Sequence, residues 1–268
     1  MKVDGKRVLI TGGSSGIGHA LAASLAVRGA RLLISGRRSE ALARATDRLK
    51  AIGANVHAVA ADVSTSEGRA KMLAAAEAQI GGLDVLINNA GGVRAGRLEH
   101  TTEAEIRAMV EVDLIAPILL TRAALPYLRR SGEGLVVNVA SGIALVGIPF
   151  YTTYAAAKAG LARFGEALRR ELKGEGIHVL TAYPGATDTP MMASSQAGPD
   201  LGFNREPAPA VAAAIVAAIE NDDFDIVRGG EARATMLALN RDDPAALDQR
   251  FALLKPALER AVSGHKAL

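Results

Sequence analysis

The stretch Arg7-Val8-Leu9-Ile10-Thr11-Gly12-Gly13-Ser14-Ser15-Gly16-Ile17-Gly18 decides how the rest of the chain is interpreted. It begins with a short apolar run, passes through a glycine-rich turn, and leads into a segment of helical period over residues 17–28. Glycines in such a turn let backbone amides and the helix N-terminus approach a pyrophosphate. Its position between a strand and a helix is the context that a nucleotide site requires. The stretch therefore predicts a nucleotide-binding turn.

Apolar runs of strand length alternate with segments of helical period along the chain. The runs are nearly continuously apolar, as expected of strands buried on both faces. This alternation predicts an α/β fold, a single-domain Rossmann-type doubly wound parallel sheet with helices on both faces. The expected strands are residues 7–11, 32–35, 56–60, 85–87, 135–139 and 179–182. The expected helices are residues 17–28, 40–52, 67–80, 105–128 and 151–172.

Two helix starts and one long loop can be placed from local patterns. Ser64 with Glu67, and Thr102 with Glu105, match the capping box, in which hydroxyl and carboxylate satisfy each other's free backbone amides. Residues 191–209 are rich in Ala, Ser, Gly and Pro and show no period, which predicts a long loop. The tail holds one more helical pattern, over residues 245–262, which Pro256 interrupts.

The composition excludes several classes of protein. A chain of 268 residues with 49% apolar residues can bury one sizeable core. Cysteine is absent, which excludes disulfides, thiolate nucleophiles and Cys-ligated zinc, and no export signal is visible, so we expect a cytoplasmic protein. Residues 208–219 form an Ala-rich stretch that is too short to span a bilayer and predicts a packed helix.

Charge and histidine placement point to a small-molecule partner. The net charge is only +3, the basic residues are scattered, and aromatic residues make up 3% of the chain, which argues against nucleic-acid binding. None of the five histidines stands four residues from another, so no metal site is expected on a helix.

The glycine spacing, Gly-x3-Gly-x-Gly with Thr11 ahead of it, resembles that of the short-chain dehydrogenase/reductase family. Further motifs of that family follow in order, each at the end of an expected element. They are Asp62-Val63, Asn88-Asn89-Ala90-Gly91, Ser141, Tyr154-x3-Lys158 and Pro184-Gly185. The resemblance covers about residues 6–230. It implies a catalytic domain over residues 1–230 with a substrate lid at about 190–209. Residues 231–268 are then expected to form a C-terminal helical extension packed on the same domain.

Tyr154 and Lys158 lie one helical turn apart, so the ammonium can approach the phenol and lower its pKa toward the working pH. The resemblance assigns Ser141 to binding the substrate oxygen and gives Lys158 a second role at the nicotinamide ribose. Asp113 stands where the family usually has an asparagine, and a carboxylate cannot donate a hydrogen bond unless it is protonated. If a backbone carbonyl holds the family's relay water, activity survives this change. If the side-chain amide is essential, the relay is impaired.

Arg37 and Arg38 follow the second expected strand, where an NAD enzyme usually places an acidic residue. A guanidinium matches a 2′-phosphate bidentately, so we expect NADP(H) as the cofactor. By resemblance, Asp62 and Val63 flank the adenine, and a threonine after Pro184-Gly185 binds the nicotinamide carboxamide. The full predicted cofactor set is Gly12, Ser14, Ser15, Gly16, Ile17, Gly18, Arg37, Arg38, Asp62, Val63, Asn89, Ala90, Gly91, Tyr154, Lys158, Pro184, Gly185, Thr187 and Thr189.

Together these residues predict an oxidoreductase that passes hydride between NADP(H) and the carbonyl or secondary alcohol of a small molecule, with Tyr154 as general acid and base. The expected pocket residues are mostly apolar, which favours an apolar substrate: Val93, Gly142, Ile143, Leu145, Phe150, Tyr151, Met191 and Met192. Arg94 and Arg97 could meet an acidic group, but we expect them to face solvent. Two alternatives remain open, an epimerase or dehydratase of the same family and a non-catalytic NADP(H)-binding redox sensor. The resemblance also implies a homodimer or homotetramer, paired through residues 105–128 and 151–172.

Overall fold

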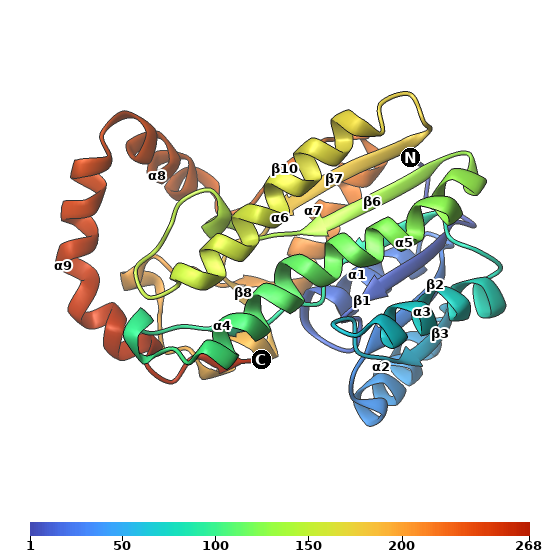
Figure 1. The fold of residues 1–268 in the computed structure, drawn as a ribbon, viewed down its shortest axis with the longest axis horizontal. Helices are drawn as coiled ribbons and strands as arrows, with labels where there is room; N and C mark the ends of the chain where they lie inside the picture. The colour runs from blue at the N-terminus through green and yellow to red at the C-terminus, as the bar shows by residue number, and fades with distance from the viewer.

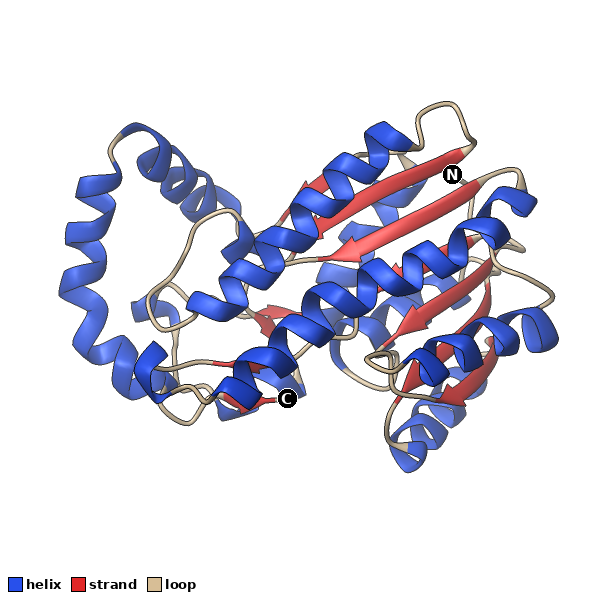
Figure 2. Cartoon of the chain, in the orientation of Figure 1, coloured by secondary structure: helices blue, strands red, loops and turns tan.

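A seven-stranded parallel sheet forms the centre of the computed structural model, which describes residues 1–268 (Figures 1 and 2). The strand order is β10-β7-β6-β4-β1-β2-β3, and every neighbouring pair is parallel. The strands are β1 (Arg7–Thr11), β2 (Arg31–Gly36), β3 (Asn55–Ala60), β4 (Val85–Asn88), β6 (Gly134–Val139), β7 (Ile177–Tyr183) and β10 (Asp225–Val227). This sheet, with helices on both faces, confirms the predicted fold class. The edge strand β10 was not predicted because its few residues are partly exposed and give no apolar run.

Helices cover both faces of the sheet, which explains why its strands are almost wholly apolar. In β1, Val8 and Ile10 join one core cluster, whereas Leu9 between them joins the cluster on the opposite face. The first cluster packs against α1 (Gly16–Ala26), α2 (Ser39–Ala51) and α7 (Ala208–Glu220). The second packs against α3 (Ser66–Ala75), α5 (Ala116–Ser131) and α6 (Thr152–Glu171). None of the helices is both long and apolar enough to cross a bilayer.

Two of the predicted helices contain a turn of π-helix. The helix predicted over 67–80 is α3 followed by a π turn at Ala76–Ile80. The helix predicted over 105–128 is α4 (Glu103–Val110), a π turn at Glu111–Ile115, and then α5. A π turn inserts a residue into the helical ladder and is frequent at functional sites. The second of these turns carries Asp113.

The two predicted helix starts had different outcomes. Thr102 caps α4, and its reciprocal bonds with Glu105 complete the predicted capping box. The prediction at Ser64 was wrong, because the hydroxyl of Thr65 accepts the bond from Gly68 N at 2.9 Å and caps α3. Ser64 instead donates through Oγ to Asp62 at 2.7 Å. Because the Ser64 hydroxyl is bonded to the Asp62 carboxylate, the cap is supplied by the adjacent hydroxyl of Thr65.

The predicted loop at 191–209 contains short ordered elements. It holds two 3₁₀ turns, at Pro190–Ser194 and Pro199–Leu201, and α7 already begins at Ala208. Strand β8 (Thr187–Asp188) pairs with β9 (Glu206–Pro207), which closes the segment at its base. The absence of a period therefore predicted an irregular segment, but backbone pairing between residues far apart in the sequence gives it order.

The tail after β10 forms two helices that stand apart from the sheet, on the side toward which its arrowheads point (Figures 1 and 2). They are α8 (Gly230–Asp242), which was not predicted, and α9 (Pro244–Val262), which continues through Pro256. The chain then returns to the main body, where β11 (Lys266–Ala267) pairs antiparallel with β5 (Val93–Arg94). Arg97 also forms an ion pair with Glu259 on α9. Residues 231–268 thus contact the main body near β5.

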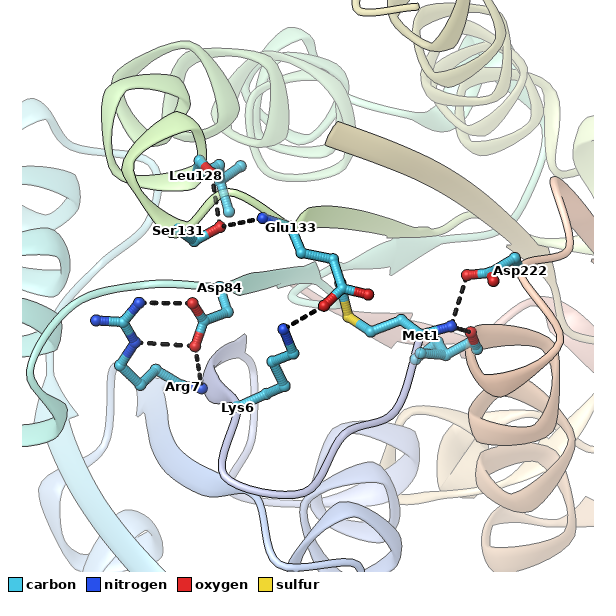
Figure 3. Close-up of polar contacts among 9 residues, drawn as sticks. Met1, Lys6, Arg7, Asp84, Leu128, Ser131, Glu133 and Asp222 are labelled. Atoms are coloured by element: carbon cyan, nitrogen blue, oxygen red, sulfur yellow. Dashed lines mark hydrogen bonds and ion pairs between the residues drawn. The ribbon is translucent and has the colours of Figure 1, made fainter. Parts of the chain in front are cut away.

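An ion pair joins the amino ends of two central strands (Figure 3). Arg7 donates to Asp84 through its backbone amide at 2.7 Å, through Nε at 2.8 Å and through Nη2 at 2.6 Å. Burial acts to raise the pKa of Asp84, but the hydrogen bonds and the charge of Arg7 outweigh it and lower the pKa. The pair therefore stabilises the fold at neutral pH, and this stabilisation is lost as the pH falls through the lowered pKa.

We predict that Asp84→Ala lowers the free energy of unfolding at neutral pH by about 2–4 kcal/mol, because the guanidinium and the amide of Arg7 both lose their acceptor. Urea unfolding followed by circular dichroism measures the change. Glu40→Ala is the control, since its pair with Arg44 spans 3.7 Å between exposed side chains, and no measurable change is expected. Equal losses in the two variants would contradict this account.

Candidate active site

A cavity of about 730 Å³ opens at the carboxyl ends of the strands and brings most of the predicted site residues together. It lies where the strand order reverses between β1 and β4, the usual ligand position in open α/β sheets. Of the predicted site residues, Gly18 and Asp113 lie behind the cavity wall. The others line it: Gly12, Ser14, Ser15, Gly16, Ile17, Arg37, Arg38, Asp62, Val63, Asn89, Ala90, Gly91, Ser141, Tyr154, Lys158, Pro184, Gly185, Thr187 and Thr189.

The glycine turn is held in place by the end of β4. The Asn89 side chain donates to Thr11 O at 2.9 Å, and Thr11 Oγ1 accepts the Asn89 and Ala90 amides at 3.0 Å each. Gly12 has a left-handed backbone with φ of 67°. A Cβ at Gly18 would lie 2.4 Å from Gly12 O, so Gly18 serves the packing of the turn rather than the cavity wall. The Asn89 side-chain amide therefore fixes the turn, a role that its inclusion in the predicted cofactor set did not indicate.

The first turn of α1 leaves its backbone amides free. Ser15 is the N-cap residue, but its side chain makes no capping hydrogen bond. Unpaired amides at a helix N-terminus attract anions. Arg37 and Arg38 lie further along the same cavity wall, both exposed. This end of the cavity therefore presents donors and positive charge.

Tyr154 and Lys158 meet at the opposite end of the cavity. Lys158 Nζ lies 5.8 Å from the centroid of the Tyr154 ring and donates to Val139 O at 3.1 Å. Burial raises the pKa of Tyr154 above that of free tyrosine, while the positive charge of Lys158 acts in the opposite direction. The cation is thus placed to stabilise a phenolate in an environment that disfavours it.

Asp113 lies directly behind Lys158 as a buried counterion. Its Oδ1 is 3.1 Å from Lys158 Nζ, and the two side chains are 0% and 5% exposed. Burial raises the pKa of Asp113 and acts to lower that of Lys158. At the lysine, the charges of Asp113 and Tyr154 and the hydrogen bond to Asp113 together outweigh burial and raise the pKa. A Cβ at Gly91 would come within 2.6 Å of Asp113 Oδ1, so glycine there makes room for the pair. The negative charge of Asp113 also acts to raise the pKa of Tyr154.

The strand end after β6 and the start of α6 present Ser141 and Tyr154 to the same space. Ser141 Oγ accepts the Ile143 amide at 3.3 Å, which orients the hydroxyl. Phe150, two residues before α6, has a φ of 70°, an uncommon conformation for a bulky side chain and one that clusters at functional sites. Its carbonyl accepts the Gly96 amide at 2.8 Å. This contact holds the strained turn that leads into the helix carrying Tyr154.

Comparison with known families shows that residues 6–200 match the short chain dehydrogenase model. The chain belongs to the short-chain dehydrogenase family. The ketoacyl reductase HetN of a Nostoc species is 32% identical over 92% of this chain and 88% of its own length. The 3-oxoacyl-[acyl-carrier-protein] reductase FabG of Vibrio cholerae is 34% identical over 71% of this chain and 77% of its own. The chain is therefore an oxidoreductase of this family.

Solved structures of short-chain dehydrogenases show the same fold. An enzyme from Burkholderia cenocepacia, solved in complex with NADP, has a TM-score of 0.78 at 32% identity and covers 86% of this chain and 99% of that chain. A 7α-hydroxysteroid dehydrogenase has a TM-score of 0.79 at 23% identity and covers 85% of this chain and 95% of that chain. The likeness to both extends beyond residue 200 and supports the observed sheet.

The segment after β7 returns to the glycine turn of this short-chain dehydrogenase. Thr187 donates to Gly185 O at 3.1 Å. A Cβ at Gly16 would lie 3.1 Å from Thr189 Cγ2, so the start of the segment at 190–209 touches the first turn of α1. Pro184 O accepts the Gly142 amide at 2.7 Å and joins this loop to the one that carries Ser141.

The substrate end of the cavity was predicted only in part. Of the expected residues, Val93, Ile143, Tyr151, Met191 and Met192 line it, whereas Gly142, Leu145 and Phe150 do not. The lining residues that sequence reasoning missed include Ile148, Phe203, Arg233, His265 and Leu268. Most of these lie beyond residue 200, where the family match ends and no motif could have indicated them.

Arg94 and Arg97 do not simply face solvent as predicted. Arg94 pairs with Glu105 at 3.4 Å, and Arg97 pairs with Glu259 on α9. Both guanidinium groups have carboxylate partners within the protein, so they fix elements around the cavity. Neither residue lines the cavity.

We predict that Asp113→Asn lowers the pKa of Tyr154, because the phenolate is relieved of a nearby negative charge and faces a lysine without a counterion. The phenolate absorbance of each protein is titrated with pH, and that of the same protein carrying Tyr154→Phe is subtracted to isolate this one phenol. Asp84→Asn is the control, since that carboxylate lies at the opposite ends of the strands and pairs with Arg7. An unchanged or higher midpoint in Asp113→Asn would refute the electrostatic role of Asp113.

Proposed function

We propose that this chain is an NADP(H)-dependent oxidoreductase that interconverts the carbonyl and secondary alcohol of a small, largely apolar molecule. The observation that carries the proposal is the shared cavity, in which the glycine turn and α1 lie at one end and Tyr154, Lys158 and Ser141 at the other. Its volume of about 730 Å³ lies within the range common for cofactor and ligand sites. Residues 231–268 are part of the same catalytic unit in this proposal.

The residues of the cavity fit a nicotinamide dinucleotide. The left-handed turn at Gly12 and the uncapped first turn of α1 offer amides to a pyrophosphate. Gly91 leaves room beside Lys158, where a ribose would lie against the ammonium. When bound, the nicotinamide supplies the hydride donor or acceptor, and the protein supplies position and electrostatics.

The protein's own residues control the proton. In the reductive direction Tyr154 donates its phenolic proton to the carbonyl oxygen as the carbon gains hydride, and in the oxidative direction the phenolate takes the proton back. Ser141 donates a hydrogen bond to the same oxygen. Lys158 stabilises the phenolate, and Asp113 holds Lys158 charged in a buried environment. Hydride and proton together account for the two electrons and two hydrogens that separate alcohol from carbonyl.

Arg37 supports the choice of NADP(H) over NAD(H). No carboxylate follows β2, and both Arg37 and Arg38 are exposed on the cavity wall without an ion-pair partner. Burial acts to raise the pKa of Asp62, but hydrogen bonds from Ser64 and the charge of Arg37 lower it, so Arg37 lies near Asp62. The Burkholderia enzyme, with NADP bound, is consistent with this preference.

The proposal includes a homodimer or homotetramer, paired through α5 and α6, which run beside each other along one face of the sheet (Figure 1). A cytoplasmic location stays a prediction from the sequence. The alternative of a non-catalytic redox sensor gives no reason for a strained turn, a buried cation and a phenol to meet at one end of the cavity.

We predict that Arg37→Ala weakens NADPH binding by about tenfold or more, because one charge-assisted hydrogen-bonding partner of the 2′-phosphate is lost, and changes NADH binding little. Titration followed by nicotinamide fluorescence measures both affinities. Arg31→Ala is the control, since Arg31 is an exposed arginine at the opposite end of the same strand. Equal weakening of NADPH and NADH would remove Arg37 from the selectivity site.

We predict that Tyr154→Phe lowers kcat for carbonyl reduction by about 10²–10⁴-fold, because the general acid is removed while the cavity keeps its shape. The rate of NADPH consumption with a panel of aliphatic ketones measures the change, and NADPH titration checks that the cofactor still binds. Tyr183→Phe is the control, a half-buried tyrosine that does not line the cavity. Activity that survives in Tyr154→Phe would overturn the assignment of the general acid.

A further inference from the structure

Arg233 is a half-buried arginine on α8 that lines the substrate end of the cavity. Its Nη1 donates to Gly142 O at 3.3 Å and approaches Met236 Sδ at 4.0 Å, and both of these acceptors are uncharged. Burial lowers the pKa of Arg233, and no acidic side chain contributes to the shift. A partly buried cation without a counterion is costly, so its position calls for an explanation.

Most other cations of this region pair with a carboxylate, and Arg205, which donates to Ser195 O at 2.6 Å instead, does not line the cavity. Arg94 pairs with Glu105, Arg97 with Glu259, and Lys158 with Asp113. Arg228, on the loop that leads into α8, pairs with Glu206. Arg233 is therefore the guanidinium at the substrate end of the cavity that has no carboxylate beside it.

Glycines make room for this guanidinium. A Cβ at Gly142 would lie 2.9 Å from Arg233 Cζ, and one at Gly229 would lie 3.0 Å from Arg233 Cβ. Gly229 also has a φ of 114°, a backbone conformation that other residues rarely adopt. The close approach of α8 to the loop after β6 thus depends on small residues from two separate segments.

The guanidinium lies close to the reacting end of the cavity. It contacts the carbonyl of Gly142, the residue directly after Ser141, and consecutive Cα atoms lie about 3.8 Å apart. The surrounding lining is apolar and comes from Ile148, Met191, Met192 and Phe203. A ligand here would meet one positive charge near Ser141 and a mostly apolar surface elsewhere, with Tyr151 and His265 as polar neighbours.

We propose that Arg233 binds a carboxylate of the substrate, a few bonds from the carbonyl carbon, so that the substrate is an oxo acid or hydroxy acid with an aliphatic body. This inference rests on the proposed function and narrows its substrate class from small apolar carbonyl compounds in general to those that carry a carboxylate. Only one guanidinium without a carboxylate partner lines this end of the cavity, and one guanidinium matches a singly charged carboxylate better than a doubly charged phosphate. The planar donor fork also fixes the orientation of the carboxylate, and with it that of the carbonyl relative to Ser141 and Tyr154.

The test compares 4-oxodecanoate with its methyl ester, a matched pair that differs in charge and keeps the same ketone. We expect kcat/KM for the acid to exceed that for the ester by about tenfold or more, and Arg233→Met to abolish this selectivity. Arg233→Lys is expected to keep part of it, because the charge remains while the fork is lost. The control is Arg250→Met, an exposed arginine on α9 outside the cavity, with no change of selectivity expected.

Calorimetric titration of 4-oxodecanoate into the NADP⁺-saturated protein, which has no hydride to transfer to the ketone, separates binding from turnover. Binding that depends on Arg233 without reduction of either compound would support the anion site and refute the proposed reaction. Reduction of the ester with no preference for the acid would support the reaction and overturn the anion site. Equal acid selectivity in Arg233→Met and in the unaltered protein would also overturn the anion site. A loss of NADPH affinity in Arg233→Met would overturn it as well, because Arg233 would then contact the cofactor.

Discussion

The parallel alignment of the seven strands is the constraint on which the site depends, because it brings the carboxyl ends of all the strands to one edge. The loop after each strand therefore lies at the same edge of the sheet. Between β1 and β4 the strand order changes direction, so the loops after these two strands run apart and leave a crevice between them. The Asn89 side chain, directly after β4, donates to Thr11 O at the end of β1. This hydrogen bond joins the two strands at the bottom of the crevice. The cavity lies above this contact, and loops far apart in the sequence line it.

Charge balance at the far end of the cavity follows from burial. Lys158 is 4% exposed, and an unpaired ammonium at this depth would tend to lose its proton. The carboxylate of Asp113 prevents that and simultaneously opposes ionisation of Tyr154. With a neutral asparagine at this position, the positive charge of Lys158 would lower the pKa of the Tyr154 phenol without opposition from a carboxylate. The substitution that departs from the family pattern thus shifts the balance between lysine and tyrosine while the cavity-lining residues stay in place.

The sequence predicted the sheet well because each central strand is buried on both faces and so reads as an apolar run. Strand β10 lies at the edge and helix α8 buries none of its residues, so neither carries a hydrophobic pattern that could have been recognised. The residues proposed for the cofactor end could also be identified from the sequence, since glycine turns and strand-end polar residues leave local signatures, and they line one cavity. Arg233 and His265 reach the cavity only through the path of the tail, which no local pattern encodes.

The division between predictable and unpredictable residues corresponds to a division of roles. In the proposed reaction, hydride and proton transfer need fixed distances among the cofactor turn, Tyr154 and Lys158, and these residues lie on elements within the family match. The substrate end is closed by the tail: His265 bonds to Ser194 at 3.0 Å and packs edge-on against Tyr151, and β11 pairs with β5. These contacts join residues 190–209 to the last residues of the chain. In the proposed function, changes in the tail therefore alter which molecule is accepted, because Arg233 and His265 of the tail line the cavity.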